Sequence, residues 1–160
     1  MFGHPQGLPW MLNVELWERF SYYGMRAILL YFSTDTAANG GLGLSENSGQ
    51  VVLASYSAAV YLLAIPGGIF ADRVIGPWPS TLYGGVVIMA GHLCLSLPVN
   101  AFSWLGIVLV AIGTGFIKPN LSTIVGGLYD KGDPRRDTGF QMFYMSINIG
   151  SLVSPLVTGW

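Results

Sequence analysis

Four charged side chains lie within an otherwise apolar, aromatic-rich stretch, residues 8–32: Glu15, Glu18, Arg19 and Arg26. The stretch is long enough to cross a bilayer, where a charge at the centre costs roughly 2.5–3.5 kcal/mol on insertion scales. These charges therefore need protein partners or a water-filled cavity. Ionisable residues inside a membrane segment typically mark a path for ions or solutes, and the sequence favours that kind of role.

Helical geometry brings these charges onto one face. At about 100° per residue they share an arc of about 140° with Tyr22 and Tyr23. Glu15 precedes Arg19 by four residues, which predicts an ion pair along the helix. Glu18 is next to Arg19 in sequence, and we expect it to pair only with another helix or a ligand. Because burial and a nearby cation act in opposite directions on a carboxyl group, such a cluster can load and release a proton.

The composition favours a membrane protein. Of 160 residues, 52% are hydrophobic and 9% are charged, whereas a soluble domain has about 25% charged residues. So few charges cannot cover a soluble surface, which argues against an interfacial amphipathic helix or a soluble bundle as alternatives for the first segment. The net charge of −1 makes nucleic acid an unsuitable partner.

No pattern in the sequence predicts a disulfide or a metal site. Cys94 is the single cysteine, and neither it nor His4 or His92 has metal-site spacing. We expect Cys94 to pack between helices. The first apolar run is too long and too charged for a cleavable signal peptide, so we expect this helix to remain in the mature protein.

Five apolar segments are predicted as membrane helices, at about residues 8–33, 48–70, 80–98, 102–128 and from 139 onward. Each is near the ~20 residues that a span requires. Four should be complete, and the fifth is cut at Trp160. Turn residues occupy the predicted connectors 39–46, 76–79 and 132–134. The sequence therefore predicts an all-α membrane protein with about four complete transmembrane helices and part of a fifth, successive helices running antiparallel.

The basic residues predict an orientation for these helices. Arg73, Lys131, Arg135 and Arg136 lie in the predicted connectors after the second and fourth segments, whereas the other connectors contain no lysine or arginine. Because cytoplasmic loops carry an excess of these residues, we expect a cytoplasmic N-terminus.

A cluster of glycines and charges follows the second segment, with Gly67, Gly68, Asp72 and Arg73. Glycines permit close helix packing, and an acid and a base at a helix end can lock neighbouring helices. The cluster resembles the loop motif of the major facilitator superfamily. An ordinary charged loop is the alternative interpretation.

Two further patterns lie in the fourth and fifth segments. Lys118 is about midway along its span and precedes Pro119, which can kink the helix. A lysine at that depth needs a carboxylate partner from another helix or a ligand, unless it snorkels to the surface. Tyr144 and Asn148 share a helix face, where a hydroxyl and an amide suit a peptide-like group or simple helix packing.

Together these residues resemble the proton-dependent oligopeptide transporter (POT/PTR) family, the peptide-transporter branch of the major facilitator superfamily. Residues 15–26 (ELWERFSYYGMR) resemble its ExxERFxYYG hallmark, and residues 143–152 (FYMSINIGSL) resemble its FYxxINxGS hallmark. The resemblance covers essentially the whole chain. Ala54 stands where mammalian members have a histidine, so the likeness is to bacterial members.

The resemblance implies roles for individual residues. Glu15, Glu18 and Arg19 match the family's proton-coupling motif. Arg26 and Lys118 match residues that hold the peptide carboxylate and form gating ion pairs. The residues implied to line the peptide site are Tyr23, Arg26, Tyr61, Lys118, Tyr144 and Asn148.

By this resemblance we expect the N-terminal helical bundle of a proton-coupled symporter for di- and tripeptides, acting by alternating access in the inner or plasma membrane. Protons are the coupling ion, no cofactor is implied, and no enzymatic chemistry is expected. The family has two six-helix halves, and the acidic partners of Arg26 and Lys118 belong to the half that this chain lacks. Two alternatives stay open: a same-family transporter of nitrate or another anion, and a truncated, transport-inactive membrane fragment that serves as an assembly subunit.

Overall fold

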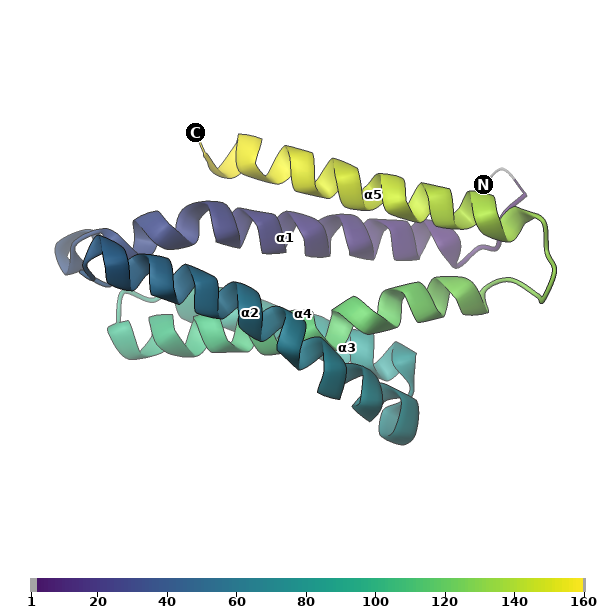
Figure 1. Cartoon of the computed structure of the whole chain (residues 1–160), viewed down its shortest axis with the longest axis horizontal. Helices are drawn as coiled ribbons and strands as arrows, with labels where there is room; N and C mark the ends of the chain where they lie inside the picture. The colour runs from purple at the N-terminus through teal and green to yellow at the C-terminus, as the bar shows by residue number, and fades with distance from the viewer. Residues whose placement is uncertain (1–2, 160) are drawn as a thin grey trace. The chain divides into compact units, whose positions relative to one another are not determined.

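A computed structural model describes residues 3–159 of the chain, and within them it is helical throughout, with short connectors. The elements are α1 (Leu8–Thr34), the 3₁₀ turn η1 (Ala37–Asn39), α2 (Glu46–Phe70), the π-helical turn η2 (Ala71–Ile75), α3 (Pro77–Leu95), α4 (Asn100–Gly127) and α5 (Arg135–Thr158) (Figure 1). The expected all-α class is confirmed. Trp160, where the fifth segment was expected to be cut, lies outside the described residues.

Four helices begin earlier than the sequence predicts, among them α4, which begins at Asn100 rather than at residue 102. α2 begins at Glu46, directly after Ser45, whose hydroxyl accepts a hydrogen bond from the Ser48 backbone N–H and caps the helix. α3 begins at Pro77 rather than at residue 80, because a proline fits the first helical turn, where its missing N–H is not needed. α5 begins at Arg135 rather than at residue 139. The prediction that residues 77–79 and 135–136 are connectors is therefore wrong.

The chain leaves α2 through a helical turn rather than an open loop. η2 carries the helix five residues past its predicted end, so Asp72 and Arg73 lie on a π-helical turn, and both are exposed. Gly76 then ends the turn with a φ of 85°, in the left-handed region that favours glycine.

Three helical stretches in residues 3–159 are long and apolar enough to cross a membrane by length and composition: Glu46–Ile75, Asn100–Gly127 and Arg135–Thr158. α1 falls short of that criterion because it carries four charged residues. α3 falls short because prolines, Trp78, Ser80 and Thr81 lower the hydropathy of its first turns.

The contacts divide the chain into two compact units, one formed by residues up to Met25 with those from Leu121 onward, and the other by Arg26–Asn120. α1 and α4 each contribute to both units.

In the first unit, α5 packs directly against the N-terminal part of α1 (Figure 1). The Ser154 hydroxyl donates a hydrogen bond of 2.5 Å to the Phe20 carbonyl. A Cβ added at Gly150 would lie 2.5 Å from the Leu16 carbonyl oxygen, so the two backbones touch there. The contact positions advance together along both helices, which are therefore parallel. Small residues allow this close approach in a membrane protein, where packing holds helices together.

In the second unit, α4 packs against α2 and α3 through facing glycines. A Cβ at Gly67 of α2 would lie 2.7 Å from the Gly115 carbonyl oxygen, and one at Gly84 of α3 would lie 2.8 Å from the Gly113 carbonyl oxygen. The buried Asn120 side-chain amide adds a hydrogen bond of 3.1 Å to the Ser80 hydroxyl of α3. This backbone contact fixes how far α2 is shifted along α4, and therefore which side chains of the two helices lie opposite each other.

Candidate functional site

One turn of α1 forms a buried ion cluster. Arg19 Nε lies 2.9 Å from Glu15 Oε1 and 2.5 Å from Glu18 Oε2. Glu15, Glu18 and Arg19 are only 3%, 5% and 7% exposed, so water screens these pairs little. The predicted Glu15–Arg19 pair is confirmed. The expectation that Glu18 pairs only with another helix or a ligand is wrong, because the long Arg19 side chain meets both carboxylates.

The cluster combines two acidic side chains with one basic side chain. Two carboxylates share one guanidinium, so the three side chains together carry a formal charge of −1 when all are ionised. Binding one proton would make the cluster neutral and would leave the guanidinium paired with the remaining carboxylate. Charge is expensive in a buried site unless it is paired.

The hallmark segment of α5 packs against the turn of α1 that carries this cluster. A Cβ added at Gly150 would lie 2.9 Å from Arg19 Cβ, which leaves no room for a side chain. On the α1 side, the ring of the buried Tyr22 lies with its centroid 5.8 Å from Arg19 Cζ and 5.1 Å from the Tyr23 ring. Gly150 was identified from the sequence only as part of the 143–152 motif. Its packing role was missed, although a glycine inside an apolar helix is a signal for close packing.

Tyr144 and Asn148 lie on the exposed side of α5. Tyr144 is 59% exposed, and Asn148 is exposed as well, as their spacing of four residues predicts for a shared face. The Asn148 amide donates a hydrogen bond of 3.0 Å to the Tyr144 carbonyl within the helix. Its amide oxygen and the Tyr144 hydroxyl can therefore face a ligand.

In the Arg26–Asn120 unit, Lys118 lies against an aromatic ring. The residue is half-buried, and its buried ammonium nitrogen lies 3.6 Å from the ring centroid of Tyr61 on α2. The carboxylate partner expected for this lysine stays a prediction. The aromatic contact was missed because the helix crossing that creates it has no periodic signal in the sequence. Arg26 is exposed. Pro119 packs beside Gly68, where an added Cβ would lie 3.5 Å from the proline ring.

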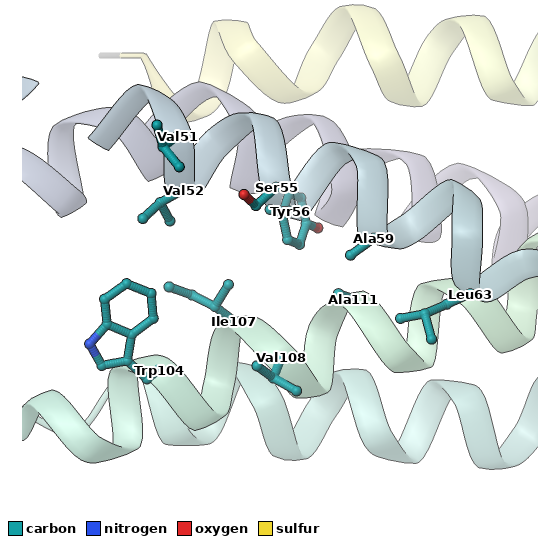
Figure 2. A pocket seen from close by; sticks show the side chains of 10 residues that line it. All are labelled: Val51, Val52, Ser55, Tyr56, Ala59, Leu63, Trp104, Ile107, Val108 and Ala111. Carbon is teal, nitrogen blue, oxygen red and sulfur yellow. The ribbon is translucent and has the colours of Figure 1, made fainter. Parts of the chain in front are cut away.

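A separate groove of about 280 Å³ lies between α2 and α4 in the same unit (Figure 2). Figure 2 shows Trp104 opposite Val51 and Val52, and apart from Ser55 and Tyr56 the lining is apolar. The lining includes neither Tyr61 nor Lys118. Such a surface can receive an apolar group but offers no cation to a carboxylate.

A polar network ties the N-terminal tail to the connector after α4 in the first unit. The His4 imidazole Nδ1 and the Tyr129 hydroxyl are hydrogen-bonded at 2.9 Å. Arg135 donates hydrogen bonds to the Gly3 carbonyl at 2.5 Å and to both carboxylate oxygens of Asp133 at 3.0 and 2.6 Å. Hydrogen bonds from the Arg135 side chain and backbone hold the pKa of Asp133 at about 2. The sequence did not predict this network.

The lowered pKa of Asp133 gives a pH prediction. A carboxyl group with a lowered pKa stabilises the folded form above its ordinary pKa of 3.8, and that stabilisation is lost as the pH falls through about 2. Carboxyl-carbon NMR of the detergent-solubilised chain should therefore show an Asp133 midpoint near 2, and Arg135→Gln should move it towards 3.8. A midpoint near 3.8 in the unchanged chain would contradict the network.

These features define a helical membrane protein with a buried cluster of ion-paired side chains on one face of α1. The chain belongs to the POT family, whose model matches residues 80–160. It is 49% identical to the uncharacterized transporter YclF of Bacillus subtilis and 47% identical to a di-/tripeptide transporter of Lactococcus lactis, covering 99% of this chain and 32% of each relative. It is also similar to the crystal structure of a peptide transporter POT in complex with sulfate, with a TM-score of 0.95 and 49% identity over 99% of this chain and 32% of that one.

The comparisons confirm the expected family, the all-helical fold and the likeness to bacterial members, and with the candidate spans they identify a multi-pass membrane protein. The chain spans about a third of the length of the curated relatives it matches.

Proposed function

We propose that this chain is the N-terminal part of a proton-coupled symporter for di- and tripeptides that works by alternating access. The observation that carries the proposal is the buried Glu15–Arg19–Glu18 cluster beneath Gly150 of α5. The name of the Lactococcus lactis relative, a di-/tripeptide transporter, supports the substrate class. The proposal needs no enzymatic step and no cofactor.

In this proposal the cluster is the coupling site. A proton bound by Glu15 or Glu18 weakens that residue's pair with Arg19 and changes the charge that lies under α5. A ligand shifts a two-state equilibrium only by binding the states with different free energies, and the proton does so through these pairs. The Ser154–Phe20 hydrogen bond and the contact at Gly150 transmit the change between α1 and α5.

Cations and hydrogen-bonding groups provide the proposed peptide contacts. Arg26 and Lys118 attract the terminal carboxylate of the peptide. The neutral groups bind its backbone amides, which every peptide shares, so that side chains can vary. The proposed peptide ligands are Tyr23, Arg26, Tyr61, Lys118, Tyr144 and Asn148. Acidic partners for the two cations would come from the remaining part of the transporter.

A second group of residues has a proposed structural role in gating. Gly67 and Gly68 allow α2 to lie against α4 near Pro119, and Asp72 and Arg73 sit at the exposed end of that pair of helices. Rigid crossings of this kind let two helices move as one body during alternating access.

The proposed location is the inner or plasma membrane, with lipid around the helices and the N-terminus in the cytoplasm. Lys131 and the neighbouring arginines support this orientation. In a Cys94→Ser background, Lys131→Cys should react with a membrane-impermeant maleimide only after the cells are permeabilised, whereas Asn39→Cys should react in intact cells. The opposite pattern would contradict the orientation.

The function is tested by uptake of dialanine into proteoliposomes that contain the full-length protein in which these 160 residues occur. Uptake should increase with an inward proton gradient and should not be reduced by nitrate. No uptake by a folded protein would reject the peptide proposal, and nitrate competition would favour the anion transporter instead. The 160-residue chain, reconstituted in parallel, should show no uptake; transport by the chain alone would contradict its being only a part.

A further inference from the structure

The N-terminal tail, residues 3–7, is fastened to the connector between α4 and α5 and to the start of α5. The His4 imidazole is hydrogen-bonded to the Tyr129 hydroxyl at 2.9 Å, and the two rings also meet edge to face. The Gly3 carbonyl accepts a hydrogen bond of 2.5 Å from the Arg135 side chain. Two neighbouring residues of the tail are thus bonded to side chains far along the chain.

The partners of the tail are themselves held in place. Tyr129 is only 7% exposed, and a Cβ added at Gly139 of α5 would collide with its hydroxyl oxygen. Arg135 donates hydrogen bonds to both carboxylate oxygens of Asp133, which stays ionised at neutral pH because its pKa is about 2. The tail is therefore bonded to side chains that are fixed relative to α5.

The tail also restrains α1 at a level that the closest helix contacts do not reach. Gly150 packs against the Leu16 carbonyl and Ser154 bonds the Phe20 carbonyl. These two contacts are about 6 Å apart along the helix axis, so they oppose sliding more than tilting. The tail enters α1 at Leu8, about 12 Å along the axis from Leu16. A restraint at that distance opposes a tilt of α1 about the Gly150 contact.

We propose that residues 3–7 form a strap that fixes the tilt of α1 against α5, with His4 and Tyr129 as its positioning residues. α1 carries the buried ion cluster, and Gly150 of α5 packs against Arg19 of that cluster. A tilt of α1 would move this turn relative to Gly150, so the strap sets how closely α5 packs there. Its effect on proton coupling rests on the proposed function, whereas the strap itself does not.

Hydrogen–deuterium exchange of the full-length protein tests the strap without any ligand. The Leu8 backbone amide donates to the Pro5 carbonyl and reports on opening of the tail. Tyr129→Phe keeps the ring but removes the hydroxyl, and it should speed this exchange about threefold to tenfold, the effect of losing one hydrogen bond. His4→Ala should do at least as much. Gln6→Ala, at an exposed position of the same tail, should leave the rate within about twofold.

A double variant shows whether His4 and Tyr129 act through each other. In the Tyr129→Phe background, His4→Ala should speed the exchange of the Leu8 amide clearly less than it does in the unchanged protein, because the hydrogen bond is already lost. Equal accelerations in the two backgrounds would mean that the two side chains act independently and would overturn the inference.

The tilt is measured by electron paramagnetic resonance between two spin labels at exposed positions. Labels at Trp10 of α1 and Gln141 of α5, in a background without other cysteines, report the separation of the two helices near the strap. The distribution of distances should be broader in Tyr129→Phe than in the unchanged protein, and Gln6→Ala should not alter it. An unaltered distribution in Tyr129→Phe would overturn the inference, because the tail would then open without releasing α1.

Transport separates positioning from general damage. In Tyr129→Phe, dialanine uptake driven by an inward proton gradient should fall about threefold to tenfold, while exchange of dialanine across the membrane without a gradient should stay within about twofold. Equal losses of both activities, or no loss of either, would overturn the positioning role. If the protein transports no dialanine while the deuterium and distance results hold, the peptide function fails and the strap stands.

Discussion

An Arg19→Met variant of the full-length protein is expected to lose proton-driven dialanine uptake and to be less stable by about 3–5 kcal/mol. The reason is that two buried carboxylates, 2.9 and 2.5 Å from Arg19 Nε, would lose the cation they share. Methionine keeps the length and apolar character of the arginine stem, so that lost charge dominates the effect. Thermal unfolding in detergent and uptake with an inward proton gradient measure the two losses.

Two further variants identify the cause. A triple variant, Glu15→Gln with Glu18→Gln and Arg19→Met, removes all three charges and should recover much of the stability that Arg19→Met loses, yet still fail to couple uptake to protons. Arg136→Met changes an exposed arginine of α5 and should alter stability by no more than about 0.5 kcal/mol. If Arg19→Met is as stable as Arg136→Met, the cluster is not the buried ion site that the structure describes.

Gly150→Ala is the second change with a large expected effect. The added methyl group would lie 2.5 Å from the Leu16 carbonyl oxygen and 2.9 Å from Arg19 Cβ, so α5 must move away from α1. Overpacking of this kind typically destabilises by about 1–3 kcal/mol. Since the movement also displaces the cluster, proton-driven uptake should fall sharply, although no ionisable group has been changed.

Gly85→Ala is the matched control because Gly85 also lies inside a helix, α3, and an added Cβ there meets nothing within 4 Å. Alanine should be neutral or stabilising there by up to about 1 kcal/mol, since glycine disfavours a helix interior. If the Gly150→Ala variant unfolds at the same temperature as the Gly85→Ala variant, that result would contradict the close contact between α1 and α5.

Features that depend on neighbours along the chain were predictable from the residues alone. The lengths of the apolar segments and the turn residues between them predicted five helices. α1 and α2 each end within one residue of the predicted position, although the π-helical turn η2 then continues directly from α2. The Glu15–Arg19 pair was predictable because residues four apart meet on any α-helix. Helix starts were less predictable: prolines read as loop residues at 77–79 lie in the first turn of α3.

Contacts between distant segments depend on how the helices pack, which periodicity along the chain does not encode. Gly150 against Arg19, Tyr61 against Lys118, and Arg135 against the Gly3 carbonyl each bring together residues far apart in the chain. Glu18 shows the same limit at short range, because its partner depends on the rotamer of Arg19 in a packed site. Periodicity indicates which face of a helix is apolar or charged, but not where two helices cross. Backbone contact at particular glycines fixes that register, and the register selects the partner of each charge.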